Sequence, residues 1–589
     1  MGARVFRFTG RRTLLAFVVV LGCVLPAATG AHAATTTVIS WKVANLAPKK
    51  TFALSDIASS NSSGVQTWSV VGKCSLKGKN IVTKASGKCA VTLTVAAKGA
   101  FTATTSTRSL QIVELSKPSV TNVGETVVEG PIKTGKGTPR VGTVDFDGKV
   151  FNYSQKEFFI SGSARSYTST VPLTDDGLWT VAPAETADYK TRIVVRRPID
   201  PAKFNGTVMV EWMNVTAGFD TPPVWSFGDM EMQRSGAIWV GVSAQRVGIE
   251  GGGNALGAAL SLKKFDPERY GVLVHPGDNF SYDIFSQVGA TVWRNPTKLF
   301  GELLPIQVLA MGESQSAFRL ATYIDALAPL QDIYSGYFVH SRGSYGAALS
   351  VAPLADIAGP RALLSRTDIK RPVLVFSSET DVVGANLGYR RAYQKDSEWF
   401  RSWEVAGTAH GDAYSLGIGD TDNGKGSGDT ALFAAMMKPP TAIYFGAVKC
   451  DLPINAGPHT YVLRSALSAL DAWVRTGKAP RSMPMLEANE DVLTYQRDTN
   501  GNAKGGIRTP QVDVPIATLS GQGQSGQSFC GLFGTTIVFT KKELKALYAT
   551  KAAFAKKWIA ATNAAVATGA ILEVDAAEIR RVAQAYPGR

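Results

Sequence analysis

Beyond about residue 145, the chain contains short apolar runs that alternate with segments of helical periodicity. Runs such as Thr207–Trp212 and Pro372–Phe376 are apolar almost throughout, which is typical of strands that are covered on both faces. Strands that alternate with helices predict a mostly parallel sheet with helices on both sides. The predicted strands are Gln155–Ile160, Thr191–Arg196, Thr207–Trp212, Ala237–Val242, Ile306–Ala310, Ile333–Val339, Pro372–Phe376 and Phe400–Val405.

Residues 36–115 have a different pattern. They are rich in Thr, Ser, Val and Lys, and the runs Gln66–Cys74 and Cys89–Val95 alternate between apolar and polar positions. Such runs, separated by turn residues, predict a small β-sandwich. With its tryptophan strand and Gly-x-Cys pair, this stretch resembles the immunoglobulin-like modules of exported bacterial proteins. Residues 116–145, rich in Gly, Pro, Thr and Val, are expected to form a linker or an irregular entry into the next domain.

The second domain is therefore expected at residues 146–589. Long inserts follow its strands, and Gly248–Tyr270 is the clearest of these lid-like segments. In open α/β sheets such inserts lie on the side where active sites form. Helices are predicted at Tyr461–Thr476 and from Lys541 onward, so the domain should end in a helical extension.

Residues 1–33 have the pattern of an export signal. A basic stretch, Arg4–Arg12, precedes the apolar run Thr13–Leu21, and Ala31-His32-Ala33 fits a cleavage site. The apolar run is too short to predict a membrane span. We therefore expect a secreted or cell-surface protein, with lipidation at Cys23 as an open alternative.

The amino-acid composition and the net charge limit the kinds of molecule that the protein is expected to bind. The chain of 589 residues is 45% hydrophobic and 19% charged, which is typical of a globular protein with a large core. Its net charge is +15, but the basic residues do not cluster with aromatic ones. No nucleic-acid binding is therefore expected. Attachment to a cell surface or an anionic polymer through the N-terminal module remains open.

Four cysteines remain after the export signal is removed, and an even number in an exported chain indicates disulfides. Three pairings are open to four cysteines. The pairing Cys74–Cys89 with Cys450–Cys530 joins residues within the same segment, and four free thiols are the alternative. No Cys/His spacing indicates zinc, and no metal or organic cofactor is expected.

The sequence Gly312-Glu313-Ser314-Gln315-Ser316 lies between a predicted strand and a predicted helix. It is a variant of the Gly-x-Ser-x-Gly nucleophile elbow, in which a strained turn lifts the serine clear of the sheet. The helix N-terminus behind the serine favours a developing oxyanion. The alternative is an ordinary strand-to-helix turn with a capping serine.

A nucleophilic serine needs a histidine base, which in turn needs an acid. His410 follows the last predicted strand, whereas His275, His340 and His459 are weaker candidates that could cap turns or pack near the site. The acidic turn Ser378-Glu379-Thr380-Asp381 follows the preceding strand. The order of serine, acid and histidine is that of the α/β-hydrolase fold.

Two carboxylates compete for the role of acid. A small residue followed three positions later by aspartate and then by aliphatic residues favours Asp381, so Glu379 is expected to face solvent or the sheet edge, and to pair with an arginine. Glu379 stays open as the alternative acid, and Glu404, inside the last strand, is weaker still. The oxyanion hole needs two backbone N–H groups, for which Gln315 and the loop at Asn214-Val215 are the candidates.

These pieces resemble a poorly characterised family of large α/β-hydrolase domain proteins. The resemblance covers residues 140–550 and implies a serine hydrolase fold, with little implied about the substrate. We expect a carboxylic-ester hydrolase in which Ser314 attacks, His410 transfers the proton and Asp381 orients His410, acting on a small-molecule or polymer-linked ester. An amidase or peptidase, or a catalytically dead scaffold that binds a surface, are the alternatives. The pieces that carry the resemblance are Val210–Val215, Asp266–Tyr270, His275–Asp278, Gly312–Ala317, Ser378–Asp381, Trp403–His410 and Gly505–Pro510.

Overall fold

The computed structural model describes most of the chain beyond the export signal. The predicted signal at residues 1–33, including Cys23, lies outside the described residues. No helix in the described part of the chain is both long and apolar enough to cross a membrane. The described ranges are 35–41, 45–46, 48–85, 87–112, 118–142, 146–252, 259–384, 386–443, 448–527 and 529–586.

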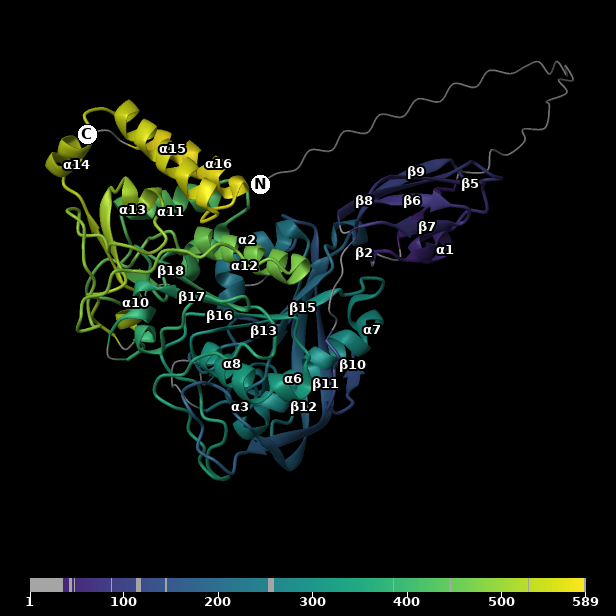
Figure 1. The fold of residues 1–589 in the computed structure, drawn as a ribbon, viewed down its shortest axis with the longest axis horizontal. Coiled ribbons are helices and arrows are strands. Elements are labelled where there is room, and N and C mark those ends of the chain that lie inside the picture. The colour runs from purple at the N-terminus through teal and green to yellow at the C-terminus, as the bar shows by residue number, and fades with distance from the viewer. Residues whose placement is uncertain are drawn as a thin grey trace, which may run out of the picture.

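A sheet of nine strands, counted over the described residues, forms the centre of the second domain (Figure 1). The strands from β14 to β18 run parallel, and an antiparallel group of three continues the sheet beyond β14. The predicted α/β fold class is confirmed. In sheet order the strands are β10 (Val127–Glu129), β11 (Tyr153–Thr168), β12 (Ala182–Pro198), β14 (Ile238–Val242), β13 (Thr207–Trp212), β15 (Gln307–Glu313), β16 (Gly336–His340), β17 (Val373–Ser378) and β18 (Phe400–Val405).

Strand β10 lies inside the stretch predicted to be a linker. Val127 pairs with Ser161, and Glu129 pairs with Phe159, along the outer edge of β11. An edge strand without a partner presents a row of unpaired backbone groups, and pairing with β10 satisfies part of this row. Residues 116–145 are therefore not wholly a linker, because their central part belongs to the sheet.

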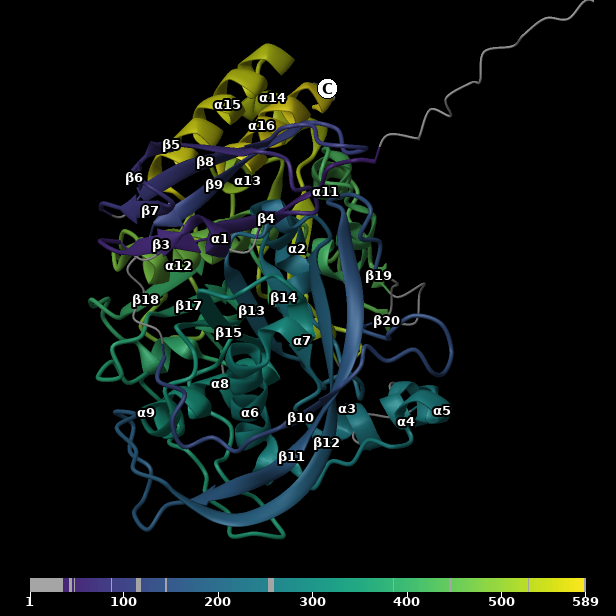
Figure 2. The same ribbon diagram turned by 90° about the vertical axis from the view of Figure 1, so that its right-hand side faces the viewer.

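Helices cover both faces of the sheet (Figures 1 and 2). On one face, α2 and α12 pack against the strands through residues such as Val224 and Val462. On the other face, α6 and α8 pack through residues such as Phe285 and Leu320. The larger helices are α2 (Pro223–Ser235), α6 (Ser281–Arg294), α8 (Gln315–Ala326), α11 (Ser427–Met437), α12 (His459–Thr476), α15 (Lys551–Thr568) and α16 (Glu573–Val582).

Shorter helices and strands connect these elements. The short helices are α1 (Leu54–Ile57), α3 (Arg246–Glu250), α4 (Leu262–Phe265), α5 (Pro267–Tyr270), α7 (Pro296–Phe300), α9 (Ala328–Gln331), α10 (Glu379–Val382), α13 (Pro510–Asp513) and α14 (Lys541–Leu547). Two small hairpins are formed by β19 (Ala442–Ile443) with β20 (Val448–Lys449), and by β21 (Ala517–Ser520) with β22 (Thr535–Val538).

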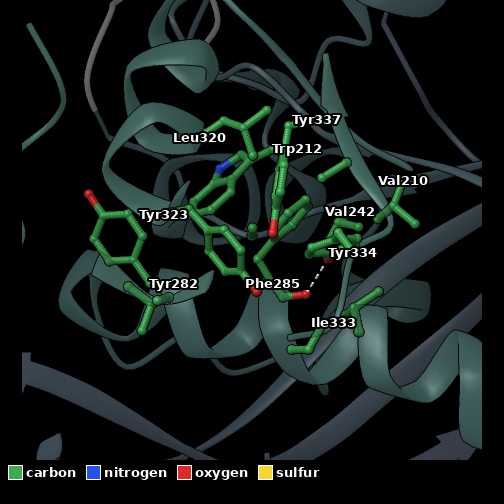
Figure 3. Packing of buried hydrophobic residues seen from close by; sticks show 14 of the residues in the cluster. Val210, Trp212, Val242, Tyr282, Phe285, Leu320, Tyr323, Ile333, Tyr334 and Tyr337 are labelled. Atoms are coloured by element: carbon green, nitrogen blue, oxygen red, sulfur yellow. Dashed lines mark hydrogen bonds between the residues drawn. The ribbon is translucent and has the colours of Figure 1, made fainter. Parts of the chain in front are cut away.

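Aromatic side chains fill the core beneath α6 (Figure 3). The Trp212 ring, at the end of β13, lies 4.7 Å from the Phe285 ring and 5.7 Å from the Tyr282 ring, centroid to centroid. The Tyr334 hydroxyl donates a hydrogen bond of 2.8 Å to the Phe285 carbonyl oxygen. This packing fixes the end of β13, and hence the start of the loop that follows it.

The N-terminal part has a core of its own, which includes Trp41, Val91 and Leu110. It lies beside the second domain (Figure 1), and the Arg108 guanidinium donates to the Pro201 carbonyl oxygen there. In the part of it that the structure describes, three small sheets have the strand orders β2-β9-β8-β5, β3-β7-β6 and β1-β4. Their strands are β1 (Ile39–Trp41), β2 (Asn45–Leu46), β3 (Thr51–Ala53), β4 (Ala58–Ser60), β5 (Gln66–Gly72), β6 (Cys74–Lys77), β7 (Asn80–Thr83), β8 (Gly87–Val95) and β9 (Thr104–Ile112).

Both predicted disulfides are confirmed. Cys74 is bonded to Cys89 within the N-terminal part, and Cys450 is bonded to Cys530 across 80 residues of the second domain. The second bond ties the hairpin region of β20 to the segment that leads into β22.

Candidate active site

Ser314 lies at the turn between β15 and α8, with the backbone angles φ 55° and ψ −121°. A non-glycine residue rarely adopts a positive φ, so this turn is strained. A Cβ atom on Gly312 would lie 2.7 Å from the Ser316 carbonyl oxygen, so the turn requires glycine there. The Ser316 hydroxyl donates to the Glu313 carbonyl oxygen at 2.8 Å and accepts from the Glu313 N–H at 3.0 Å. Ser316 therefore stabilises the turn at the position where the usual pattern has glycine.

Asp381 and His410 come from the turns after β17 and β18 and are hydrogen-bonded to each other. The distance from His410 Nδ1 to Asp381 Oδ1 is 2.6 Å. Asp381 Oδ2 accepts from the Ser378 N–H at 2.6 Å and from its hydroxyl at 2.8 Å, which fixes the carboxylate. Burial raises the pKa of Asp381, but the charge and hydrogen bond of His410 outweigh burial, and the pKa is lowered overall.

Glu379 and Glu404 lie elsewhere. Glu379 is fully buried, and its two carboxylate oxygens accept from the N–H groups of Gly407 at 2.6 Å and Gly521 at 2.9 Å. The expectation that Glu379 faces solvent is therefore wrong, because the first turn of α10 directs it inward. Over the described residues it forms no direct ion pair with an arginine; burial raises its pKa, and the positive charge of Arg497 acts to lower it. Glu404 is paired with Arg390 at 2.6 Å. Over the described residues, neither carboxylate contacts His410.

The second ring nitrogen of His410 faces a carboxylate that the sequence reasoning did not single out. Glu313 Oε1 lies 3.2 Å from His410 Nε2. Asn214 Nδ2 donates to Glu313 Oε2 at 3.2 Å and to the Glu313 carbonyl oxygen at 3.0 Å. The signal in the sequence was a charged residue two positions after the apolar run Val308–Met311, since a charge carried at the end of a buried strand needs a partner.

Of the three predicted oxyanion donors, one backbone N–H group already has a hydrogen-bond acceptor and two have none among the described residues. The backbone N–H of Asn214 donates to the Thr221 carbonyl oxygen at 2.9 Å, so the prediction that it faces an oxyanion is wrong. This hydrogen bond belongs to the turn that connects β13 to α2. Over the described residues, the N–H groups of Val215 and Gln315 have no hydrogen-bond acceptor, so these two remain candidates. The Gln315 side chain pairs with that of Gln245, accepting from Gln245 Nε2 at 2.9 Å and donating to Gln245 Oε1 at 2.5 Å.

Residues 128–581 match the family described as "Alpha/beta hydrolase domain". This chain belongs to that family. The match spans more than half of the chain and includes the turns that carry Ser314, Asp381 and His410. No curated protein matches the sequence.

Solved structures that resemble this α/β hydrolase include three from bacteria. A serine hydrolase without a lid, XC6422 from Xanthomonas campestris, is 11% identical, with 42% of this chain and 85% of that chain covered and a TM-score of 0.23. The rice cell wall degrading esterase LipA from Xanthomonas oryzae is 9% identical, with 43% and 84% covered and a TM-score of 0.24. A glucuronoyl esterase from Solibacter usitatus is 10% identical, with 48% and 85% covered and a TM-score of 0.23.

Within the described residues, the other histidines of the α/β hydrolase have structural partners. His275 Nδ1 accepts from the Gly277 N–H at 3.2 Å, and its Nε2 bonds the Ala244 carbonyl oxygen at 2.9 Å. His340 and His459 contact each other. Within the described ranges, no group of three or more His, Cys, Asp or Glu side chains is arranged to hold a metal ion.

Proposed function

We propose that this α/β hydrolase is an exported serine hydrolase that cleaves carboxylic esters. The observation that carries the proposal is the 2.6 Å hydrogen bond between His410 Nδ1 and Asp381, from turns that follow adjacent strands. The other ring nitrogen of His410 lies 3.2 Å from Glu313, the residue that precedes Ser314 on its strained turn. Nucleophile, acid and base follow one another along the chain in the order of the α/β-hydrolase fold. Each follows the carboxyl end of a parallel strand, where the sites of such sheets lie.

In the proposed reaction, Ser314 Oγ bonds to the acyl carbon while its proton passes to His410 Nε2. The imidazolium then gives this proton to the leaving alcohol as the ester C–O bond breaks. Water attacks the acyl-enzyme by the same route, which releases the acid and restores the serine. Asp381 keeps Nδ1 protonated throughout, so that Nε2 is the atom that exchanges protons.

The negative oxygen of the tetrahedral intermediate would be held by the N–H groups of Gln315 and Val215. The Gln315 N–H lies at the N-terminus of α8, where the helix dipole favours negative charge. Removal of one oxyanion donor typically costs about 10²–10³ in kcat, so this pair would supply a large part of the rate enhancement.

Export and attachment complete the proposal. Two disulfides support an oxidising environment for the mature protein. The N-terminal part, with its own core, would act as an immunoglobulin-like module that holds the enzyme at a cell surface or an anionic polymer. No residue of the proposed triad comes from this module.

A second candidate is a hydrolase scaffold without activity that binds a surface. The observation that favours it is the contact of His410 Nε2 with Glu313, since a triad base must face the serine. Labelling by a fluorophosphonate probe separates the two candidates, because only an activated serine reacts with it.

The test compares the mature protein with Ser314→Ala on ester and amide substrates graded by acyl length. Loss of a triad member typically lowers turnover by several orders of magnitude, so Ser314→Ala should abolish both turnover and labelling. Ser235→Ala, at the far end of α2, is the matched control and should behave as the parent. Turnover by Ser314→Ala within tenfold of the parent would contradict the assignment, and cleavage of amides alone would point to an amidase or peptidase.

A further inference from the structure

His410 has a carboxylate at each of its ring nitrogens. Asp381 Oδ1 lies 2.6 Å from Nδ1, and Glu313 Oε1 lies 3.2 Å from Nε2. Glu313 is only 5% exposed, and Asn214 holds its other carboxylate oxygen. The Glu313 carboxylate is therefore fixed beside the atom that the proposed reaction uses as its base.

At this distance Glu313 Oε1 and His410 Nε2 form an ion pair when the imidazole is protonated, and no hydrogen bond joins them over the described residues. The negative charge of an ionised carboxylate so close to the ring favours the protonated imidazole. In this structure, over the described residues, Nε2 makes no hydrogen bond to the Ser314 hydroxyl. The Nε2 position is thus engaged with Glu313 before substrate binds.

We propose that Glu313 is a positioning residue of the triad, which holds the Nε2 proton of His410 in the resting enzyme. This inference rests on the proposed serine-hydrolase function. His410 becomes a base when the Nε2–H bond breaks and the proton either bonds to Glu313 Oε1 or leaves to solvent. The freed nitrogen then takes the Ser314 proton as the serine oxygen bonds to the acyl carbon. Over one turnover this Nε2 proton is neither created nor consumed.

The charges around His410 agree with this arrangement. Burial lowers the pKa of His410, but the negative charges of Glu313 and Asp381 outweigh burial and raise it to about 9. Burial raises the pKa of Glu313 to about 7, against the opposing charge of His410. Of the histidines nearby, His340 and His459 have lowered pKa values because they are buried, so they add no positive charge at neutral pH.

One further carboxylate lies near Glu313. Glu211 is fully buried on β13, where it accepts from the N–H groups of Val224 and Trp225 and from Trp239 Nε1. Burial raises the pKa of Glu211 to about 8, and the nearby charge of Glu313 acts in the same direction. Glu211 therefore does not compete for His410, and a negative charge on Glu211 would only favour the protonated form of His410 further.

The decisive measurement is the pH dependence of kcat/KM for p-nitrophenyl acetate, compared between the parent and Glu313→Gln. This profile reports the ionisation of the free enzyme, and the activated leaving group needs little protonation. Removal of the negative charge lowers the pKa of His410, so the rising limb should move to lower pH by about one unit or more. One pH unit below the parent's limb, the variant should then hold a fraction of neutral imidazole up to about tenfold larger.

The matched control is Glu404→Gln, a buried Glu→Gln change at a carboxylate that bonds Arg390 and the Leu486 N–H, and its limb should coincide with the parent's. A limb of Glu313→Gln that coincides with the parent's, at whatever overall rate, would overturn the inference. Should Glu313→Gln not fold, Glu313→Asp withdraws the carboxylate from Nε2, and its limb should move in the same direction.

A second readout does not depend on turnover. NMR titration of the histidine side chains in Ser314→Ala, with and without Glu313→Gln, follows the pKa of His410 directly. A lower pKa in the double variant supports the inference, and equal pKa values overturn it. This separates the two failures, because a protein that turns over no ester would refute the proposed function and still report on the contact between Glu313 and His410.

Discussion

His340 and His459 face each other with their Nε2 atoms 2.8 Å apart. His459 Nδ1 lies 2.9 Å from the Ala409 carbonyl oxygen, which can only accept, so Nδ1 carries the proton. The Nε2 atom of a neutral His459 must then accept from His340 Nε2–H. His340 Nδ1 is left without a proton, and over the described residues it has no hydrogen-bond partner. The pair is therefore a neutral, buried connection next to the residue that precedes His410.

This pair predicts a loss of stability in acid. Burial lowers the pKa of His459 to about 4 and that of His340 well below its ordinary value. Below the ordinary histidine pKa of about 6.5 the unfolded chain takes up protons that the folded pair refuses. The free energy of unfolding should therefore fall as the pH drops from about 6.5 to about 4, by up to about 1.4 kcal/mol per pH unit for each histidine. Urea unfolding at several pH values measures this slope.

The matched variant for this prediction is His340→Gln combined with His459→Gln. Glutamine side chains can hydrogen-bond to each other but do not titrate in this range. The slope between about pH 6.5 and about pH 4 should be smaller in the double variant than in the parent. Equal slopes would show that the histidines are not neutral in the folded protein.

The choice between the two acids predicts opposite phenotypes. Asp381→Asn should keep the fold but favour the wrong tautomer of His410, and lower kcat by up to about 10⁴. Glu379→Gln should leave the chemistry largely intact and lower stability by about 1–3 kcal/mol, because its NH₂ group would face a backbone N–H. Steady-state kinetics and urea unfolding of both variants distinguish the roles. A larger loss of kcat in Glu379→Gln would make Glu379 the acid.

The Cys450–Cys530 bond should stabilise the second domain. It closes a loop of 80 residues, and a disulfide typically contributes about 2–4 kcal/mol to stability. Replacement of both cysteines by serine should lower the urea midpoint of the whole second domain. The control replaces Cys74 and Cys89, whose bond lies in the N-terminal part, and should leave the hydrolase unfolding transition unchanged. An unchanged midpoint for the first variant would contradict the prediction.

Removal of residues 34–115 should leave an active hydrolase. The N-terminal part has a separate core and contributes no residue to the proposed site, although Arg108 contacts Pro201. We expect kcat/KM on small esters within about twofold of the parent, since surface changes away from the site usually alter stability by less than about 0.5 kcal/mol. Binding to insoluble anionic polymers should be lost. A truncated protein that does not fold would show that the two parts depend on each other.

The sequence was informative where the chemistry is local. Ser314 lies on a turn defined by five consecutive residues, and His410 follows an apolar strand, so both could be located from short patterns. Asp381 could be favoured over Glu379 from the spacing to Ser378, which in the structure caps α10 together with Asp381. The mostly parallel sheet followed from its continuous apolar runs.

The remainder depends on contacts between distant segments. The hydrogen bond from the Asn214 N–H to the Thr221 carbonyl oxygen forms only because the chain turns back toward α2. The contact of Glu313 with His410 joins the ends of strands β15 and β18, which are not adjacent in the sheet. Strand β10 could not be predicted because its three residues form a strand only against the edge of β11. No local pattern encodes such pairings.

Glu379 connects the C-terminal segment of this protein, and not its N-terminal part, to the proposed active site. Its carboxylate joins Gly407, three residues before the proposed base, to Gly521, which lies far along the chain just after β21. The C-terminal segment therefore belongs to the framework of the site, while the N-terminal part stands outside it. An engineer who wishes to shorten the enzyme, immobilise it or fuse it to another protein should therefore alter the N-terminal end. A C-terminal truncation that removes Gly521 would disturb the geometry between acid and base.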